Sequence, residues 1–179
     1  MQRQTELQNW LRAVYPEQNF ELSFAAADAD FRRYFRAAFA DGKTVICMDA
    51  PPDKMSVAPY LKVQKLFNML NVPQVLHEDE AQGFMVLNDL GSTTFLTAMQ
   101  QEQGAEAHKV LLLEAIDELV ELQKASRAGE LPDYDRDIML REINLFPEWF
   151  VAKELGRELN FKQRQLWQQT IDTLLPPLL

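Results

Sequence analysis

The sequence predicts an α+β protein in which a β-rich N-terminal half is followed by an all-helical half. Residues 20–88 contain short segments of alternating apolar and polar residues separated by turn signals, which is typical of strands. From residue 93 onward, apolar residues recur at helical spacing. Hydrophobic residues make up 47% and charged residues 25%, a globular composition. We therefore expect two lobes, covering residues 1–90 and 91–179.

The N-terminal half is predicted to begin with an amphipathic helix, because apolar residues from Leu7 to Val14 follow helical spacing and Pro16 ends the pattern. The predicted strands cover residues 20–24, 31–39, 44–49, 75–78 and 84–88. Asp41-Gly42-Lys43 supplies a turn between the second and third strands. A helix over residues 57–70 is expected between the third and fourth strands.

The C-terminal half is predicted to contain three main helices. The first covers residues 105–125, with Leu112, Ile116 and Leu119 on one face. The second covers 136–155 and is interrupted at Pro147, and the third covers 161–175 and ends before two prolines. The aspartates at 133, 135 and 137 lack the glycine and glutamate of a calcium loop, so they predict turn and N-cap roles.

Charge and cysteine content narrow the function classes. The net charge of −9 argues against nucleic acid or an anionic membrane as the main partner. A single cysteine, Cys47, excludes a disulfide framework and a thiolate zinc site. No apolar run approaches the ~20 residues of a membrane span, and the polar N-terminus carries no secretion signal. We expect a cytosolic, cytoplasmic protein.

The segment HEDEAQGFMVLNDLG (77–91) contains an H-x-D and a D-L-G that resemble kinase catalytic signatures. A kinase catalytic loop places a metal-binding Asn five residues after the Asp, but counting from Asp79 reaches Phe84. The catalytic interpretation therefore fails. An apolar strand that runs into Asn88-Asp89-Leu90-Gly91 and then into helices is instead typical of a kinase hinge, whose backbone groups bind adenine.

Four segments in order extend this interpretation: ADADFRRYFR (27–36), TVICMDAPP (44–52), FMVLNDLG (84–91) and LPDYDRDIMLREINLFPEWFVAKELG (131–156). Together they resemble the aminoglycoside-phosphotransferase-like kinases, and among them the bacterial amino-sugar kinases that phosphorylate N-acetylmuramate and N-acetylglucosamine. The resemblance implies a protein-kinase-like fold, with a β-rich N-lobe and an incomplete helical C-lobe. It also implies ATP and Mg²⁺ as cofactors and an amino sugar as substrate, with a role in peptidoglycan recycling.

The resemblance also suggests cofactor-binding residues. The loop over the ATP phosphates corresponds to Ala27, Asp28, Ala29 and Asp30, where the family form begins with glycine. The hinge corresponds to Leu87, Asn88 and Asp89. Met48 stands where most of the superfamily has a phosphate-binding lysine, so another cation must meet the phosphates.

The candidates for that cation are three arginines near the second strand. By strand alternation, Arg33 shares a face with Phe35, whereas Arg32 and Arg36 share the other face. We assign Arg33 to the candidate cofactor site, while the choice among the three stays open. Glu142 and Trp149 are candidate sugar-binding residues, because an indole can stack on a sugar and a carboxylate can bind its hydroxyls.

The family's catalytic loop and metal-binding segment follow the helix that 161–175 represents, and this sequence holds neither, so we assign no catalytic residue and no metal ligand. We expect the N-terminal part of an ATP-dependent phosphotransferase, inactive as an isolated chain. The alternatives are a non-catalytic remnant that binds a nucleotide or a partner, and a structural scaffold. An apolar stripe from Trp167 to Leu178 predicts self-association or binding of a downstream fragment.

Overall fold

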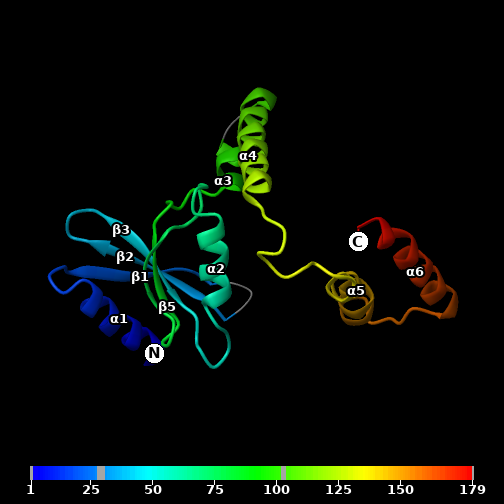
Figure 1. The fold of residues 1–179 in the computed structure, drawn as a ribbon, viewed down its shortest axis with the longest axis horizontal. Coiled ribbons are helices and arrows are strands. Elements are labelled where there is room, and N and C mark those ends of the chain that lie inside the picture. Colours follow the sequence, from blue (N-terminus) through cyan, green and yellow to red (C-terminus); the bar gives the residue numbers. More distant parts are fainter. Residues whose placement is uncertain (1, 28–30, 102–103, 179) are drawn as a thin grey trace. The chain divides into compact units, whose positions relative to one another are not determined.

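The computed structural model describes residues 2–27, 31–101 and 104–178. Within these ranges, five strands form one antiparallel sheet in the order β1-β2-β3-β5-β4 (Figure 1). The strands are β1 (Phe20–Ala27), β2 (Arg33–Phe39), β3 (Thr44–Asp49), β4 (Val75–Asp79) and β5 (Phe84–Asn88). Two of them, β3 and β5, have the bounds that the sequence predicts.

The helices follow the predicted order, so the α+β prediction is confirmed. They are α1 (Gln2–Val14), α2 (Ala58–Leu66), α3 (Phe95–Gln101), α4 (Ala105–Ala125), α5 (Arg136–Leu145), a π-helix η1 (Phe146–Glu154), α6 (Phe161–Leu174) and a short 3-10 segment η2 (Pro176–Leu178). Helix α2 is shorter than the predicted 57–70. The described residues contain no helix long and apolar enough to cross a membrane.

One face of the sheet packs against α1. Leu7 and Leu11 of α1 are fully buried there, on alternate residues of β2, β3 and β5. The sheet residues of this cluster are Phe35, Ala37, Phe39, Val45, Cys47, Phe84 and Val86. Burial raises the pKa of the Cys47 thiol to about 12, so the thiol stays protonated at neutral pH.

The opposite face packs against α2, which connects β3 to β4 (Figure 1). Because side chains alternate along a strand, the residues between those of the first cluster point to this face. The second cluster consists of Met48, Ala50, Val57, Leu61, Met85 and Leu87. The sheet is therefore the middle layer between one helix on each side.

A glycine holds the turn between β4 and β5 against the end of β3. Gly83 has φ +71°, and its carbonyl accepts a hydrogen bond of 2.8 Å from the backbone of Ala50. A Cβ at Gly83 would lie 1.9 Å from the carbonyl oxygen of Ala50. Only glycine provides both the conformation and the close approach that this position requires.

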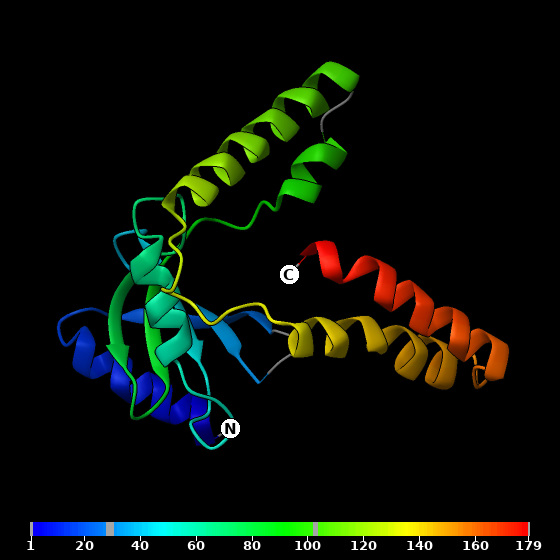
Figure 2. The same cartoon turned by 45° about the vertical axis from the view of Figure 1, so that its right-hand side comes forward.

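The chain divides into two compact units, Met1–Ser126 and Arg127–Leu179. In the first unit, α3 lies alongside one end of α4 (Figure 2). The boundary predicted at residue 90 lies within this unit, between β5 and α3. That α3 and α4 belong to the C-terminal lobe, as the sequence suggests, stays a prediction.

The second unit consists of α5, η1, α6 and η2. Asp135 caps α5 by accepting a 2.9 Å hydrogen bond from the backbone of Ile138, as predicted for this aspartate run. Regular α-helix ends at Leu145, and a π-helix with Pro147 near its start follows, so the predicted interruption is confirmed. Trp167 of α6 donates to Asn144 at 3.1 Å, which joins α6 to α5.

Candidate functional site

The sheet face toward α2 carries two rows of side chains in register across three strands. Tyr34, Met48 and Met85 form one row, and Arg36, Ile46 and Leu87 form the next. Met48 and Met85 have no exposed surface and Leu87 has almost none. This apolar face ends at the start of β2 on one side and at the segment after β5 on the other.

A cleft of about 520 Å³ lies between this face and α2. Its lining consists of Arg32, Met48, Ala50, Met55, Ser56, Val57, Pro59, Tyr60 and Val63. Among these described residues, the one charged side chain is that of Arg32. Burial raises the pKa of Tyr60, and the nearby Arg32 charge acts in the opposite direction. The cleft therefore combines an apolar floor with a guanidinium and two hydroxyl groups.

The other end of the same face is closed by an ion pair. Arg36 donates to Asp89 from Nε at 2.5 Å and from Nη2 at 3.1 Å. The backbone N–H of Gly91 also donates to Asp89 at 2.9 Å. The hydrogen bond from Arg36 is the largest influence that lowers the pKa of Asp89 to about 2. These bonds fix the segment that follows β5.

Asn88, the last residue of β5, is also held by hydrogen bonds. Its Oδ1 accepts a 2.6 Å hydrogen bond from the backbone N–H of Gln74, and its own N–H donates to the carbonyl of Gln74 at 3.0 Å. Asn88 thus joins the end of β5 to the residue that precedes β4. The side-chain oxygen of Asn88 is therefore engaged within the protein.

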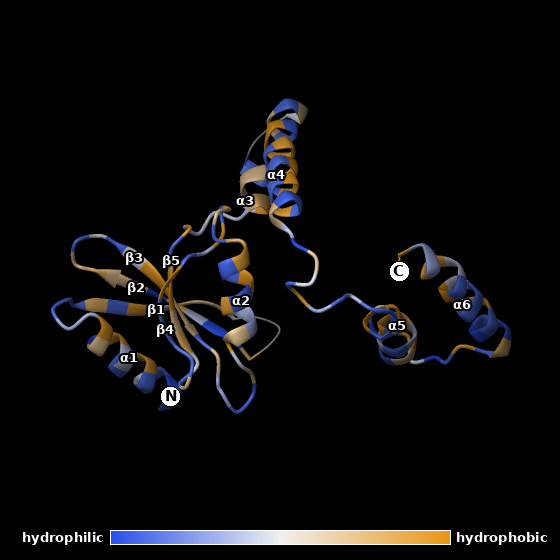
Figure 3. Ribbon diagram, viewed as in Figure 1, coloured by the Kyte–Doolittle hydropathy of each residue, from blue (hydrophilic) through white to orange (hydrophobic). Residues whose placement is uncertain are grey.

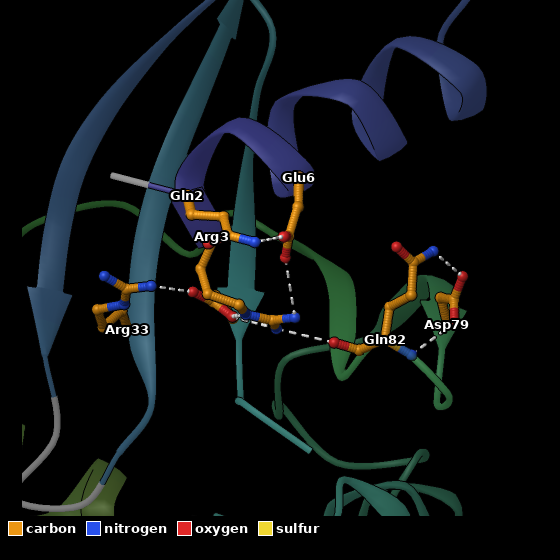
Figure 4. A network of polar contacts seen from close by, with 7 residues as sticks. Gln2, Arg3, Glu6, Arg33, Asp79 and Gln82 are labelled. Atoms are coloured by element: carbon orange, nitrogen blue, oxygen red, sulfur yellow. Dashed lines mark hydrogen bonds and ion pairs between the residues drawn. The ribbon is translucent and has the colours of Figure 1, made fainter. Parts of the chain in front are cut away.

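The α1 face holds a buried carboxylate. Asp49 is fully buried at the end of β3, and its oxygens accept from Arg3 at 3.1 and 2.5 Å and from Arg33 at 2.5 Å. Arg3 also donates to the carbonyl of Gln82 at 2.8 Å and stacks 4.3 Å from the centroid of the Phe84 ring. Figure 4 shows Arg3 and Arg33 converging from α1 and β2. This network joins the N-terminus of α1 to β2, β3 and the β4–β5 turn.

The structure brings some of the predicted cofactor-binding residues together and separates others. Met48 and Leu87 lie on the α2 face, and Asp89 is held at its edge by Arg36. Arg33 lies on the α1 face, bonded to Asp49. Ala27 ends β1, whereas the predicted phosphate-loop residues Asp28, Ala29 and Asp30 lie outside the described residues.

Arg32 is a cleft residue that the sequence analysis left among three candidate cations, and Tyr60 is a cleft residue that it did not single out. Strand alternation placed Arg32 on the face opposite Arg33 but did not tell which face holds the cleft. Tyr60 falls on the apolar stripe of a helix, where nothing distinguishes a cleft residue from a core residue. Its position became evident only once α2 had been placed on the sheet.

The predicted sugar-binding residues lie in the second unit. Glu142 on α5 is exposed and accepts a 3.3 Å bond from its neighbour Arg141. Trp149 in the π-helix has 62% of its surface exposed. Both side chains are therefore accessible to a ligand.

Two cofactors can be tested against these residues. The cleft lies within the roughly 300–1,000 Å³ range of small-molecule sites, and its cation suits an anionic group, so a nucleotide fits its size and chemistry. Magnesium needs oxygen ligands, usually carboxylates. Within the described ranges, no three His, Cys, Asp or Glu side chains gather closely enough to hold a metal ion.

Comparison with known proteins gives three relatives that share one name. The chain is 81% identical, over its whole length, to an N-acetylmuramate/N-acetylglucosamine kinase of Neisseria meningitidis serogroup B, and it covers 54% of that protein. It is 38% identical over 157 residues to the kinase of this name from Pseudomonas aeruginosa, covering 87% of this chain and 45% of the relative. The Pseudomonas putida kinase is 36% identical over 156 residues, covering 86% of this chain and 44% of the relative.

A scan against models of protein families finds no match. The chain spans about half the length of the curated relatives that it matches. It is thus similar, over most or all of its residues, to about half of each of three bacterial amino-sugar kinases.

Proposed function

We propose that this chain is the nucleotide-binding part of an ATP-dependent kinase that phosphorylates N-acetylmuramate- or N-acetylglucosamine-type amino sugars. The observation that carries the proposal is the 81% identity, along all 179 residues, to a protein named for that activity. Identity at this level makes the same fold and ligand the simplest expectation. The two relatives from Pseudomonas support the same assignment at lower identity.

The architecture of the first unit supports a kinase-like nucleotide lobe. An antiparallel sheet with a helix between its third and fourth strands, followed by a short segment leading into helices, matches the arrangement implied by the sequence resemblance. We propose that the nucleotide lies on the α2 face. Met48 and Leu87 would then provide apolar contacts, and backbone groups of Asn88 and Asp89 other than the Asn88 N–H, which donates to Gln74, would bind the adenine edge.

The chemistry of phosphoryl transfer explains what such a lobe contributes. Catalysis is mostly positioning and neutralisation of charge on the transferred group, and a bound Mg²⁺ supplies part of that neutralisation. The residues of this chain would orient the base, exclude water from the α2 face and hold the phosphates. We propose that the loop at residues 27–30 covers those phosphates.

The second unit supports a sugar-binding role for Glu142 and Trp149. Trp149 exposes a flat indole that can stack on a sugar ring, and the exposed Glu142 carboxylate can accept hydrogen bonds from hydroxyl groups. We propose that both contact the amino sugar. In an active kinase chimera that contains this chain, replacing Trp149 with Ala should then raise the KM for sugar without raising the KM for ATP.

A second candidate function is nucleotide binding without phosphoryl transfer by this chain alone. The observation that favours it is that, in the part of the chain that the structure describes, no cluster of carboxylates is available for a metal. The chain would then bind ATP but leave both amino sugars unmodified.

Exposed apolar side chains suggest an association surface. No residue of α4 is buried, although the structure describes the whole helix, and Figure 3 shows hydrophobic residues along its length. Along the predicted stripe of α6 and the residues after it, Ile171 and Leu175 are buried, whereas Leu174 and Leu178 are about half exposed or more. We propose that these surfaces contact a second copy or a further segment of kinase. Light scattering should show association that rises with concentration, and a monomer throughout would contradict this.

The kinase proposal is tested by exchanging this chain for the matching segment of the Neisseria meningitidis kinase. In a chimera, this chain replaces the 179 matching residues of the Neisseria meningitidis kinase, and transfer of labelled phosphate from ATP to each amino sugar is measured. We expect activity within a few-fold of the parent. A folded chimera that binds neither ATP nor sugar, beside an active parent, would refute the assignment. In parallel, phosphorylation of either sugar by the 179-residue chain alone would rule out the binding-only candidate.

A further inference from the structure

Three arginines lie within five residues around the start of β2, and the structure gives each a different position. Arg33 faces α1 and bonds the buried Asp49. Arg36 faces α2, at the end of the sheet near Asp89, and bonds that carboxylate through two nitrogens. Arg32 lines the cleft between the sheet and α2.

The cleft around Arg32 favours an anionic ligand. Its lining includes Met48 and Tyr60, and Arg32 is close enough to Tyr60 for its charge to act on the pKa of the phenol. Helix α2, which forms the opposite wall, has the sequence APYLKVQKL and contains no carboxylate, and its two lysines are exposed and do not line the cleft. Among the described residues that line the cleft, no acidic side chain opposes an anion.

The position of Arg32 also matches the length of a nucleotide. Arg36 lies four positions after Arg32, a distance of about 13 Å at the usual rise of a strand. Arg36 marks the end of the α2 face where the backbone after β5 would bind adenine. Arg32 marks the other end, immediately before β2. An extended nucleoside polyphosphate spans a distance of this order.

We propose that Arg32 is the cation that binds the nucleotide phosphates in this chain, where β3 carries Met48 and Arg33 is bonded to Asp49. This inference rests on the proposed nucleotide-binding function and names the residue that would provide its phosphate affinity. A guanidinium donates to two phosphate oxygens at once, so its charge-assisted bonds add to affinity for ADP and ATP and contribute nothing for adenosine.

The test is calorimetric titration of the 179-residue chain with ADP and, separately, with adenosine. Replacing Arg32 with Ala should weaken ADP binding about 10- to 100-fold, the range for hydrogen bonds to charged groups, and change adenosine binding by less than about threefold. Arg32→Lys keeps the charge and should recover part of the loss. Arg12→Ala is the matched control, because Arg12 lies on α1, bonds to Asn9 at 3.2 Å and does not line the cleft.

The possible outcomes separate this inference from the proposed function. If Arg32→Ala binds ADP as tightly as the unmodified chain, the assignment of Arg32 is wrong and the nucleotide site stands. Equal losses for ADP and adenosine in both Arg32 variants would mean that Arg32 shapes the cleft, which also overturns the assignment. If the unmodified, folded chain binds neither ligand, both proposals fail. Circular dichroism of each variant confirms folding, and Arg32→Lys provides the comparison if Arg32→Ala is unfolded.

Discussion

Replacing Asp49 with Asn should destabilise the first unit more than any surface substitution of the same kind. Asp49 has no exposed surface and accepts three hydrogen bonds from Arg3 and Arg33. An aspartate is rarely buried in this way unless it is paired. Asparagine keeps the shape but removes the charge, so the two guanidinium groups would lose the carboxylate that they share, while Arg3 would keep its ion pair with Glu6 at 3.5 Å.

The magnitude follows from the burial of the partners. Breaking a buried ion pair from one side costs about 3–5 kcal/mol. The side chains of Arg3 and Arg33 are 26% and 37% exposed, so water can reach both, and we expect the lower end, about 3 kcal/mol. At about 2–4 °C per kcal/mol for a chain of this size, Tm should fall by about 6–12 °C.

Urea denaturation followed by tryptophan fluorescence and circular dichroism measures the change. Asp53→Asn is the matched control, because Asp53 is 72% exposed and lies 3.4 Å from Lys54. Its loss should cost under about 0.5 kcal/mol. If Asp49→Asn costs no more than this control, the network does not stabilise the fold in the way that its burial implies.

Three further predictions use other parts of the first unit. Gly83→Ala should cost at least about 2 kcal/mol, because the new Cβ meets the carbonyl of Ala50, while Gly42→Ala, with a similar φ and open space, should cost less; equal losses would exclude the contact as the cause. The pKa of Asp89 is lowered to about 2 from 3.8, so its contribution of about 2 kcal/mol is complete above pH 4 and is lost as pH falls through 2. The free energy of unfolding of Asp89→Asn, measured with urea at several pH values, should not show this loss at low pH. If its pH dependence equals that of the unmodified chain, the prediction is contradicted. The Cys47 thiol, with its pKa raised to about 12, should react with a thiol reagent only after unfolding, and rapid labelling of folded chain would contradict its burial.

The sequence predicted elements whose signals are local. Strands 44–49 and 84–88 and the helix 105–125 have the predicted bounds, because alternation, turn residues and helical spacing mark them directly. The first strand continues beyond its predicted end at residue 24, to Ala27. Its last residues pair with β2 across a bulge after Phe24, and that pairing is a tertiary effect without a local pattern.

The candidate site was harder to predict, because it depends on which face of the sheet meets which helix. Alternation separated Arg32 from Arg33, but no sequence pattern told which of the two faces would hold the cleft. The bond between Arg3 and Asp49 joins residues 46 positions apart, and such pairs are visible only in the folded chain. The π-helix at 146–154 changes the hydrogen-bond pattern without changing the apolar spacing, so the sequence showed an interruption and not its type.

The location of the nucleotide is tested most directly by photo-crosslinking with 8-azido-ATP, followed by mass spectrometry of the labelled peptides. We expect label within residues 85–91 or on side chains of β2 and β3 that face α2, and we expect unmodified ATP to compete for it. Competable label on α1 or on the sheet residues packed against α1 would contradict the proposed site, as would the absence of any label that ATP removes.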